Sequence, residues 1–139
     1  MDYAGKSVLL AADNRDMRQM LLEMLRPLNF GRIDQAISGA QALSFAANLR
    51  YECVLIDLTQ DGELSLATVQ AIRAAQGKKT GILVLAGRNI EEDVHHAETA
   101  GADALVAKPF STANFAAMVA RVTTRTPPPP ADTTDDVYI

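Results

Sequence analysis

Residues 81–86 read Gly-Ile-Leu-Val-Leu-Ala, a continuous apolar run of the length of a β-strand. Residues 53–57 (Cys-Val-Leu-Ile-Asp) and residues 7–12 (Ser-Val-Leu-Leu-Ala-Ala) are runs of the same kind. A strand that is apolar at nearly every position fits a parallel sheet whose two faces are both covered by helices. Shorter β-type runs at residues 32–36 and 104–107 bring the predicted strands to five.

Segments of helical length and period lie between these runs. The first carries an apolar stripe that we expect to face the core, made of Met17, Met20, Leu21, Met24, Leu25 and Leu28. Further helices are predicted near residues 38–49, 66–76, 89–101 and 111–122. Three of them begin with capping-box or staple spacing, namely Ser38 with Gln41, Asn89 with Glu92, and Ser111 between Phe110 and Phe115. The alternation predicts an α/β fold, a doubly wound five-stranded parallel sheet with five helices.

The charge of the chain is unevenly distributed. The 139 residues hold 17 acidic and 13 basic side chains, a formal net charge of −4. Residues 126–139 contain three Asp and no Lys or Arg, so residues 1–125 keep 14 acids and 13 bases, a charge of −1. This balance argues against direct binding of nucleic acid. We expect one domain in residues 1–125 and a disordered Pro-rich acidic tail or linker in residues 126–139.

Other patterns exclude several classes of protein. Cys53 is the single cysteine, which excludes an internal disulfide framework, and its apolar neighbours favour a buried side chain. No secretory signal and no apolar run of about 18 residues is present, so we expect a cytoplasmic protein without a membrane partner. The adjacent His95 and His96 point in different directions on a helix, which disfavours a metal pair. A Walker-type phosphate loop and a Ser-His or Cys-His arrangement are lacking, so we do not expect an enzyme.

Polar residues follow the predicted strands at their carboxyl ends, where the sites of open α/β sheets lie. Asp13 follows the first strand, Asp57 ends the third, and Lys108 follows the fifth. We expect the three to converge at one edge of the sheet. Carboxylates together with a backbone carbonyl suit Mg²⁺. A carboxylate can also attack phosphorus to form an acyl phosphate, and a Lys can pair with a phosphoryl oxygen.

Three motifs in this order carry a resemblance to a known family. They are Asp13-Asn14-Arg15-Asp16-Met17-Arg18, then Val54-Leu55-Ile56-Asp57, then Gly101-Ala102-Asp103 followed by Val106-Ala107-Lys108-Pro109-Phe110. With them, residues 6–124 resemble the receiver domain of bacterial two-component response regulators. The resemblance implies the flavodoxin-like or CheY-like fold, with strand order 2-1-3-4-5.

The resemblance also implies roles for single residues. Asp57 would be the phosphoacceptor, and Mg²⁺ would be held by Asp13, Asp57 and the carbonyl of Thr59. Lys108 would bind the phosphoryl group and sense its arrival, and Pro109 would follow a cis peptide bond. A histidine kinase or a phosphotransfer protein would be the donor. A downstream protein would bind the face formed by the fourth helix, the fifth strand and the fifth helix.

Three positions depart from the family pattern. Ala12 stands where the family has the first of two adjacent acids, so we expect Mg²⁺ binding to be weak or absent, with Asp16 offsetting part of the loss. Ala86 stands in place of the Thr or Ser whose hydroxyl contacts the phosphoryl group. Leu105 stands in place of the aromatic residue that moves with that hydroxyl. The switch is therefore predicted to be degenerate.

These departures leave three functions open. The first is a phosphorylatable receiver whose output is a protein contact and whose two sites are weakly coupled. The second is a pseudo-receiver, an interaction module that works without phosphorylation. The third, with less support, is a receiver that binds a nucleotide second messenger through arginines, which here are scattered (Arg15, Arg18, Arg121 and Arg125).

Overall fold

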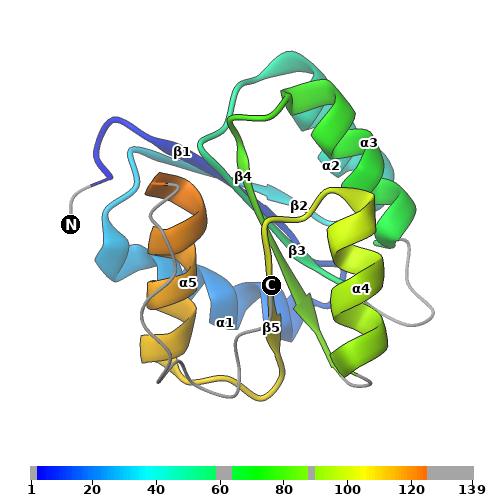
Figure 1. Ribbon diagram of the computed structural model, residues 1–139. Helices are drawn as coiled ribbons and strands as arrows, with labels where there is room; N and C mark the ends of the chain where they lie inside the picture. The colour runs from blue at the N-terminus through cyan, green and yellow to red at the C-terminus, as the bar shows by residue number, and fades with distance from the viewer. Residues whose placement is uncertain (1–2, 59–63, 88–89, 125–139) are drawn as a thin grey trace.

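The computed structural model describes residues 3–58, 64–87 and 90–124, in which five parallel strands alternate with five α-helices (Figure 1). The strands are β1 (Ser7–Ala11), β2 (Arg32–Ala36), β3 (Cys53–Asp57), β4 (Gly81–Ala86) and β5 (Ala104–Ala107). The helices are α1 (Arg15–Leu25), α2 (Gly39–Asn48), α3 (Leu66–Gln76), α4 (Ile90–Ala100) and α5 (Thr112–Thr124), with a 3-10 turn η1 (Arg26–Leu28) after α1. The sheet order is β2-β1-β3-β4-β5, which confirms the predicted fold class.

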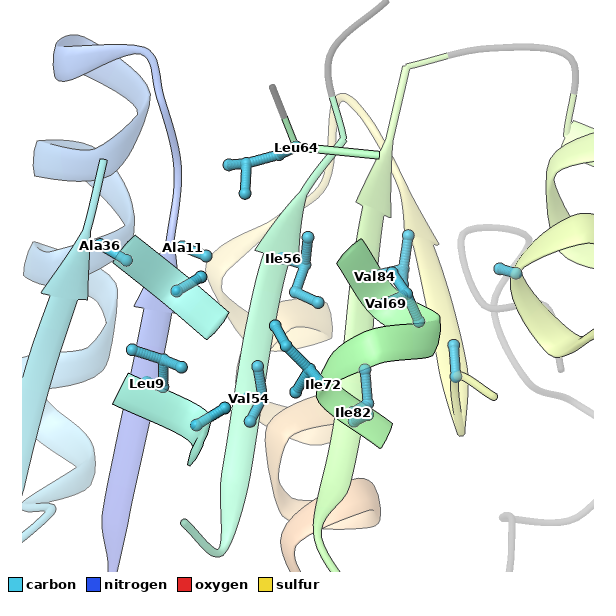
Figure 2. Packing of buried hydrophobic residues seen from close by; sticks show 14 of the residues in the cluster. Leu9, Ala11, Ala36, Val54, Ile56, Leu64, Val69, Ile72, Ile82 and Val84 are labelled. Carbon is cyan, nitrogen blue, oxygen red and sulfur yellow. The ribbon is translucent and has the colours of Figure 1, made fainter. Parts of the chain in front are cut away.

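The apolar runs are explained by helices on both faces of the sheet (Figure 1). On one face, α1 and α5 pack through side chains such as Leu21 and Phe115. On the other face, α2, α3 and α4 cover a second cluster that includes Val54 and Ile72 (Figure 2). Every residue of β3, β4 and β5 is buried, since successive side chains of a strand enter opposite clusters.

Two details of the predicted elements were wrong. The first strand was expected to include Ala12, but β1 ends at Ala11, although the Ala12 N–H still donates to the Ala36 carbonyl at 3.1 Å. Met20 was expected to face the core and is 44% exposed. The buried line of α1 runs through Leu21 and Leu25, and Met20 lies at the edge of that line.

The start of α2 is capped by a variant of the predicted capping box. The Ser38 hydroxyl accepts a hydrogen bond from the Gln41 N–H at 3.1 Å, as expected. The Gln41 side chain does not return to Ser38; it accepts from the Ile37 N–H at 2.7 Å. Both bonds satisfy backbone donors at the point where the chain leaves β2 and enters the helix.

The start of α5 has the predicted cap and staple. The Ser111 hydroxyl accepts from the Asn114 N–H at 3.0 Å. The rings of Phe110 and Phe115 stack with centroids 5.8 Å apart, the hydrophobic contact expected across a capped helix start. The contact fixes the chain directly after β5. The predicted cap at Asn89 lies outside the described residues.

The expectation of a buried cysteine is confirmed. Cys53 is fully buried, and burial raises the pKa of its thiol to about 12. His95 and His96 are both exposed on α4. In the described part of the chain, none of the helices combines the length and the apolar character needed to cross a lipid bilayer. The predicted tail, residues 126–139, is outside the described residues.

Candidate functional site

The carboxyl edge of the sheet places Asp57 beside Ala12. The parallel register of β1 and β3 pairs Ala11 with Ile56, so the next residues, Ala12 and Asp57, are neighbours. Leu10 and Leu55, two positions earlier, both lie in the α1/α5 cluster. Because side chains alternate along a strand, Ala12 and Asp57 point to this same face. The position that carries a carboxylate in the resembled family is therefore a methyl group next to Asp57.

Asp57 is buried and paired. Its side chain is only 1% exposed, and its Oδ1 forms an ion pair with Nζ of Lys108, whose side chain is 23% exposed. Lys108 is held by its own backbone, because its N–H donates to the Ala86 carbonyl at 2.8 Å. The peptide bond between Lys108 and Pro109 is cis, as the resemblance implied. The structure thus brings together two of the predicted site residues from β3 and β5.

Burial dominates the acidity of Asp57. Removal from water raises the pKa of the carboxyl, the hydrogen bond and the charge of Lys108 lower it, and the nearby charge of Asp13 raises it, so the pKa stays above its usual value. The Lys108 ammonium therefore offsets only part of the rise in the pKa of Asp57 that burial and the charge of Asp13 cause. The pocket still favours the addition of positive charge.

Replacing Asp57 by Asn is expected to stabilise the metal-free fold by about 1–2 kcal/mol at pH 8, because a buried amide costs less than a buried carboxylate. The pKa of Asp57 in the folded protein is raised above the 3.8 of the free side chain. The Asp57 carboxylate therefore destabilises the fold increasingly as the pH rises from 3.8 through the raised pKa of the folded protein, and it has no such effect well below pH 3.8. Urea unfolding at several pH values, with EDTA present, measures the difference.

The matched control for this prediction is Asp16→Asn, which changes an exposed carboxylate on α1. Its unfolding curve should follow that of the unchanged protein at every pH. An Asp57→Asn variant that is less stable than the unchanged protein at pH 8 would show that the ion pair with Lys108 outweighs the burial of the carboxylate.

The carboxylates available for a metal are those of Asp13 and Asp57. Asp13 follows β1 and is close enough for its charge to act on Asp57. The third predicted ligand, Thr59, is outside the described residues, within which no group of three or more His, Cys, Asp or Glu side chains forms a metal site. Mg²⁺ is usually held by one or two carboxylates and keeps several waters. The donor set therefore fits Mg²⁺, with one carboxylate fewer than the family pattern.

The two switch positions are buried and apolar. Ala86 ends β4, and its methyl group lies in the α2/α3/α4 cluster with Val84. Leu105 is fully buried in the same cluster, together with Ala97 and Ala102. Ala86 offers no hydroxyl to a phosphoryl group, and Leu105 packs inward. The side chains of these two positions thus supply neither a hydroxyl donor nor a movable ring to the site.

Arg18 has a role in the site that sequence reasoning missed. Its Nη1 donates to the Ala12 carbonyl at 2.8 Å, which ties the first turns of α1 to the end of β1. In the sequence, Arg18 reads only as one of several scattered arginines. Its place in the motif that begins at Asp13 was the available signal, because five residues on a helix bring a long side chain back over the preceding loop.

The family of the chain is shown by comparison with known proteins. The model of the response regulator receiver domain matches residues 8–120. The chain belongs to the response regulator receiver family. Among solved structures, this receiver is similar to the Vibrio cholerae chemotaxis protein CheY4, with a TM-score of 0.76, 26% identity, and coverage of 84% of this chain and 98% of that one.

A second similar structure is the receiver domain of the sensor histidine kinase PA1611 from Pseudomonas aeruginosa PAO1. It has a TM-score of 0.74 and 26% identity, and the match covers 86% of this receiver and 98% of that chain. That structure has a magnesium ion coordinated in its active-site cleft. At least one receiver similar to this one therefore binds Mg²⁺ in its active-site cleft.

The curated relatives are longer proteins. The DNA-binding response regulator MtrA of Mycolicibacterium smegmatis is 31% identical over 121 residues, which are 86% of this receiver and 51% of MtrA. The transcriptional regulatory protein ResD of Bacillus subtilis is 28% identical over 111 residues, 80% of this receiver and 45% of ResD. The receiver spans about half the length of these curated relatives. It is a module of two-component signalling, of a family whose members are typically signalling modules without enzymatic activity.

Proposed function

We propose that Asp57 accepts a phosphoryl group from a phosphohistidine of a histidine kinase or a phosphotransfer protein. The observation that carries the proposal is the buried Asp57 carboxylate, paired with Lys108 at the carboxyl edge of the sheet. A carboxylate oxygen attacks phosphorus and the N–P bond breaks. The imidazole nitrogen keeps the electron pair and takes up a proton, and the product on Asp57 is an acyl phosphate.

The residues around Asp57 prepare it for this step. The Lys108 ammonium can be shared between the carboxylate and the phosphoryl oxygens, whose charge must be met in the transition state. Asp13 and Asp57 would hold Mg²⁺, which when bound supplies further positive charge to the phosphoryl group. Since burial keeps water away from Asp57, the charge of Lys108 acts at a low local dielectric.

The proposed output is a contact with another protein on the face formed by α4, β5 and α5, and not a direct contact with nucleic acid. Ala86 and Leu105 supply neither the hydroxyl nor the ring of the usual switch, so phosphorylation should change the affinity of that face only slightly. A phosphate reservoir or a weakly switched adaptor fits these properties. The phosphodonor would place the protein in the cytoplasm, and the module would have no enzymatic activity of its own.

Incubation with ³²P-labelled acetyl phosphate and Mg²⁺ tests the proposal. We expect acid-stable, base-labile label on the unchanged chain and on the control Glu98→Gln, which changes an exposed carboxylate of α4, and no label on Asp57→Asn. The result follows from the chemistry of an acyl phosphate on a single carboxylate. Absence of label on the unchanged chain, with acetyl phosphate or with a phosphorylated donor protein, would overturn it.

A second candidate, the pseudo-receiver, is favoured by the methyl groups of Ala12 and Ala86. Both stand where a phosphorylatable site has polar side chains, and both are buried. An interaction module of this kind would bind its partner without phosphate or metal. A titration with Mg²⁺, followed by the amide shifts of Asp13 and Asp57, separates the two functions. If the amide chemical shifts of Asp13 and Asp57 stay constant up to tens of millimolar Mg²⁺, the pseudo-receiver is favoured.

A further inference from the structure

Three exposed cations gather at the edge of the sheet opposite to Asp57. Arg50 lies in the turn between α2 and β3, and Lys78 and Lys79 lie in the turn between α3 and β4. We call these three residues the cationic corner. Both turns lead into the amino ends of neighbouring strands, because β3 and β4 pair in parallel with Cys53 opposite Gly81.

A buried hydrogen-bond network holds the two turns of the cationic corner together. Arg50 Nη1 donates to the Gln76 carbonyl at 2.6 Å. The Gln76 side chain accepts from the Tyr51 N–H at 2.9 Å and donates to the Ala46 carbonyl at 2.7 Å. The Thr80 hydroxyl donates to the Tyr51 carbonyl at 2.8 Å. Because Gln76 and Thr80 are buried, this network keeps the cationic corner in one arrangement.

The neighbouring acids do not neutralise the cationic corner. Asp34 accepts from Arg32 at 3.0 Å and from the Tyr51 hydroxyl at 2.6 Å. Asp103 is paired with Arg73 at 2.7 Å. Within residues 3–58, 64–87 and 90–124, no ion pair includes Arg50, Lys78 or Lys79. Glu52 follows Arg50 by two residues in the same turn and, among the described residues, forms no ion pair with the three cations; counted with it, the corner keeps a net positive charge.

The described chain ends beside the cationic corner. A Cβ atom on Gly81 would clash with the Val122 carbonyl oxygen, so the last turn of α5 packs directly on the first residue of β4. Gly81 is two residues after Lys79, and α5 ends at Thr124. The sequence then continues through Pro at residues 127–130 to the carboxylates Asp132, Asp135 and Asp136.

We propose that the acidic segment, residues 131–136, binds the cationic corner of the same chain. The three carboxylates of the segment are opposite in charge to the net positive corner, and this complementarity does not depend on phosphorylation of Asp57. Asp132 is eight residue steps after Thr124. At about 3.3 Å per residue they reach about 26 Å, whereas neighbouring strands are only about 4.8 Å apart. The tether keeps the effective concentration of the segment at the corner high.

The experiment uses the full 139-residue chain with a nitroxide attached to Thr134→Cys. Cys53 does not compete for the label, because its thiol is fully buried. We expect the nitroxide to cause loss of the amide signals of residues 50, 78 and 79 in ¹⁵N spectra at low salt. The signals should return at about 0.5 M NaCl, where the Debye length falls to about 4 Å.

Charge variants identify the contact. Lys78→Gln/Lys79→Gln and Asp132→Asn/Asp135→Asn/Asp136→Asn should each restore the signals, while Arg15→Gln, at an exposed cation of α1, should not. Signal loss that survives these variants, that falls on another surface, or that is absent at low salt would overturn the proposal. So would signal loss in a mixture of nitroxide-labelled and ¹⁵N-labelled chains, because it would show that the acidic segment binds a second copy.

Discussion

Replacing Lys108 by Met is expected to lower the free energy of unfolding by about 3 kcal/mol at pH 8, because it removes one partner of a buried ion pair. Met keeps an unbranched side chain of similar length but carries no charge. The Asp57 carboxylate, which is 1% exposed, would then be buried with Ala12 and the charge of Asp13 as neighbours and without its cation. Urea unfolding of the metal-free variant measures the loss.

The loss caused by Lys108→Met should depend on pH. Lys108 lowers the pKa of Asp57. Removing Lys108 therefore raises the pKa of Asp57 in the folded protein further above 3.8. Well below pH 3.8 the carboxyl is protonated in both proteins, and the difference in stability becomes small. As the pH rises through the raised pKa of the variant, the charged form must be buried alone and the difference becomes large.

Two further proteins complete the test of Lys108→Met. The double variant Lys108→Met/Asp57→Asn removes both charges and should recover most of the stability. Lys79→Met, at an exposed Lys of the α3–β4 turn, should leave stability within about 0.5 kcal/mol of the unchanged protein. An equal loss at pH 4 and pH 8, or no recovery in the double variant, would show that Lys108 stabilises the fold by packing and not by charge.

Most of the sheet could be predicted from the sequence because β1, β3, β4 and β5 are apolar at nearly every position. Residues 53–57 and 81–86 were predicted as strands and are found as β3 and β4 with the same bounds. Exposure on the helices was harder to predict. An apolar stripe is about 100° wide, so periodicity alone does not tell that Met20 and Leu43 lie at its exposed edge.

Of the site, the sequence could predict only which residues stand at the carboxyl ends of the strands. Asp57 and Lys108 follow from the alternation of strands and helices, because the carboxyl ends of parallel strands meet at one edge. The contact of Arg18 had only its place in the motif after Asp13 as a signal, and the contacts of Gln76 had none. Gln76 bonds to residues 25–30 positions away, and no local pattern in the sequence indicates a partner at that separation.

The carboxyl and amino edges of the sheet carry charge of opposite sign. At the carboxyl edge, the buried carboxylate of Asp57 and the half-buried carboxylate of Asp13 share one ammonium, and burial, followed by the charge of Asp13, raises the pKa of Asp57. At the amino edge, the cationic corner has positive charge in excess. Because these edges are separated by the length of the strands, screening makes them nearly independent. Changes at Lys78 or Lys79 should therefore leave the chemistry of Asp57 unaltered.

Replacing Ala12 by Asp is expected to raise the affinity for Mg²⁺ by about tenfold or more. Strands are about 4.8 Å apart, so the new carboxylate would stand next to Asp57 on the same face of the sheet. At about 5 Å and an effective dielectric constant of about 20, each pair of unit charges interacts by about 3 kcal/mol. Even after desolvation this leaves more than the roughly 1.4 kcal/mol that corresponds to a factor of ten. Amide shifts during Mg²⁺ titration measure the affinity.

The same carboxylate should weaken the fold when no metal is bound. It adds a like charge beside Asp57, which raises the pKa of that carboxyl further and destabilises the EDTA-treated protein by about 2 kcal/mol. Mg²⁺ should therefore increase the melting temperature of Ala12→Asp more than that of the unchanged receiver. Ala12→Asn has the same shape without the charge and should gain little affinity. If Asn and Asp had equal effects, the missing charge at Ala12 would not be the cause of weak metal binding, and the shape of the pocket would have to explain it.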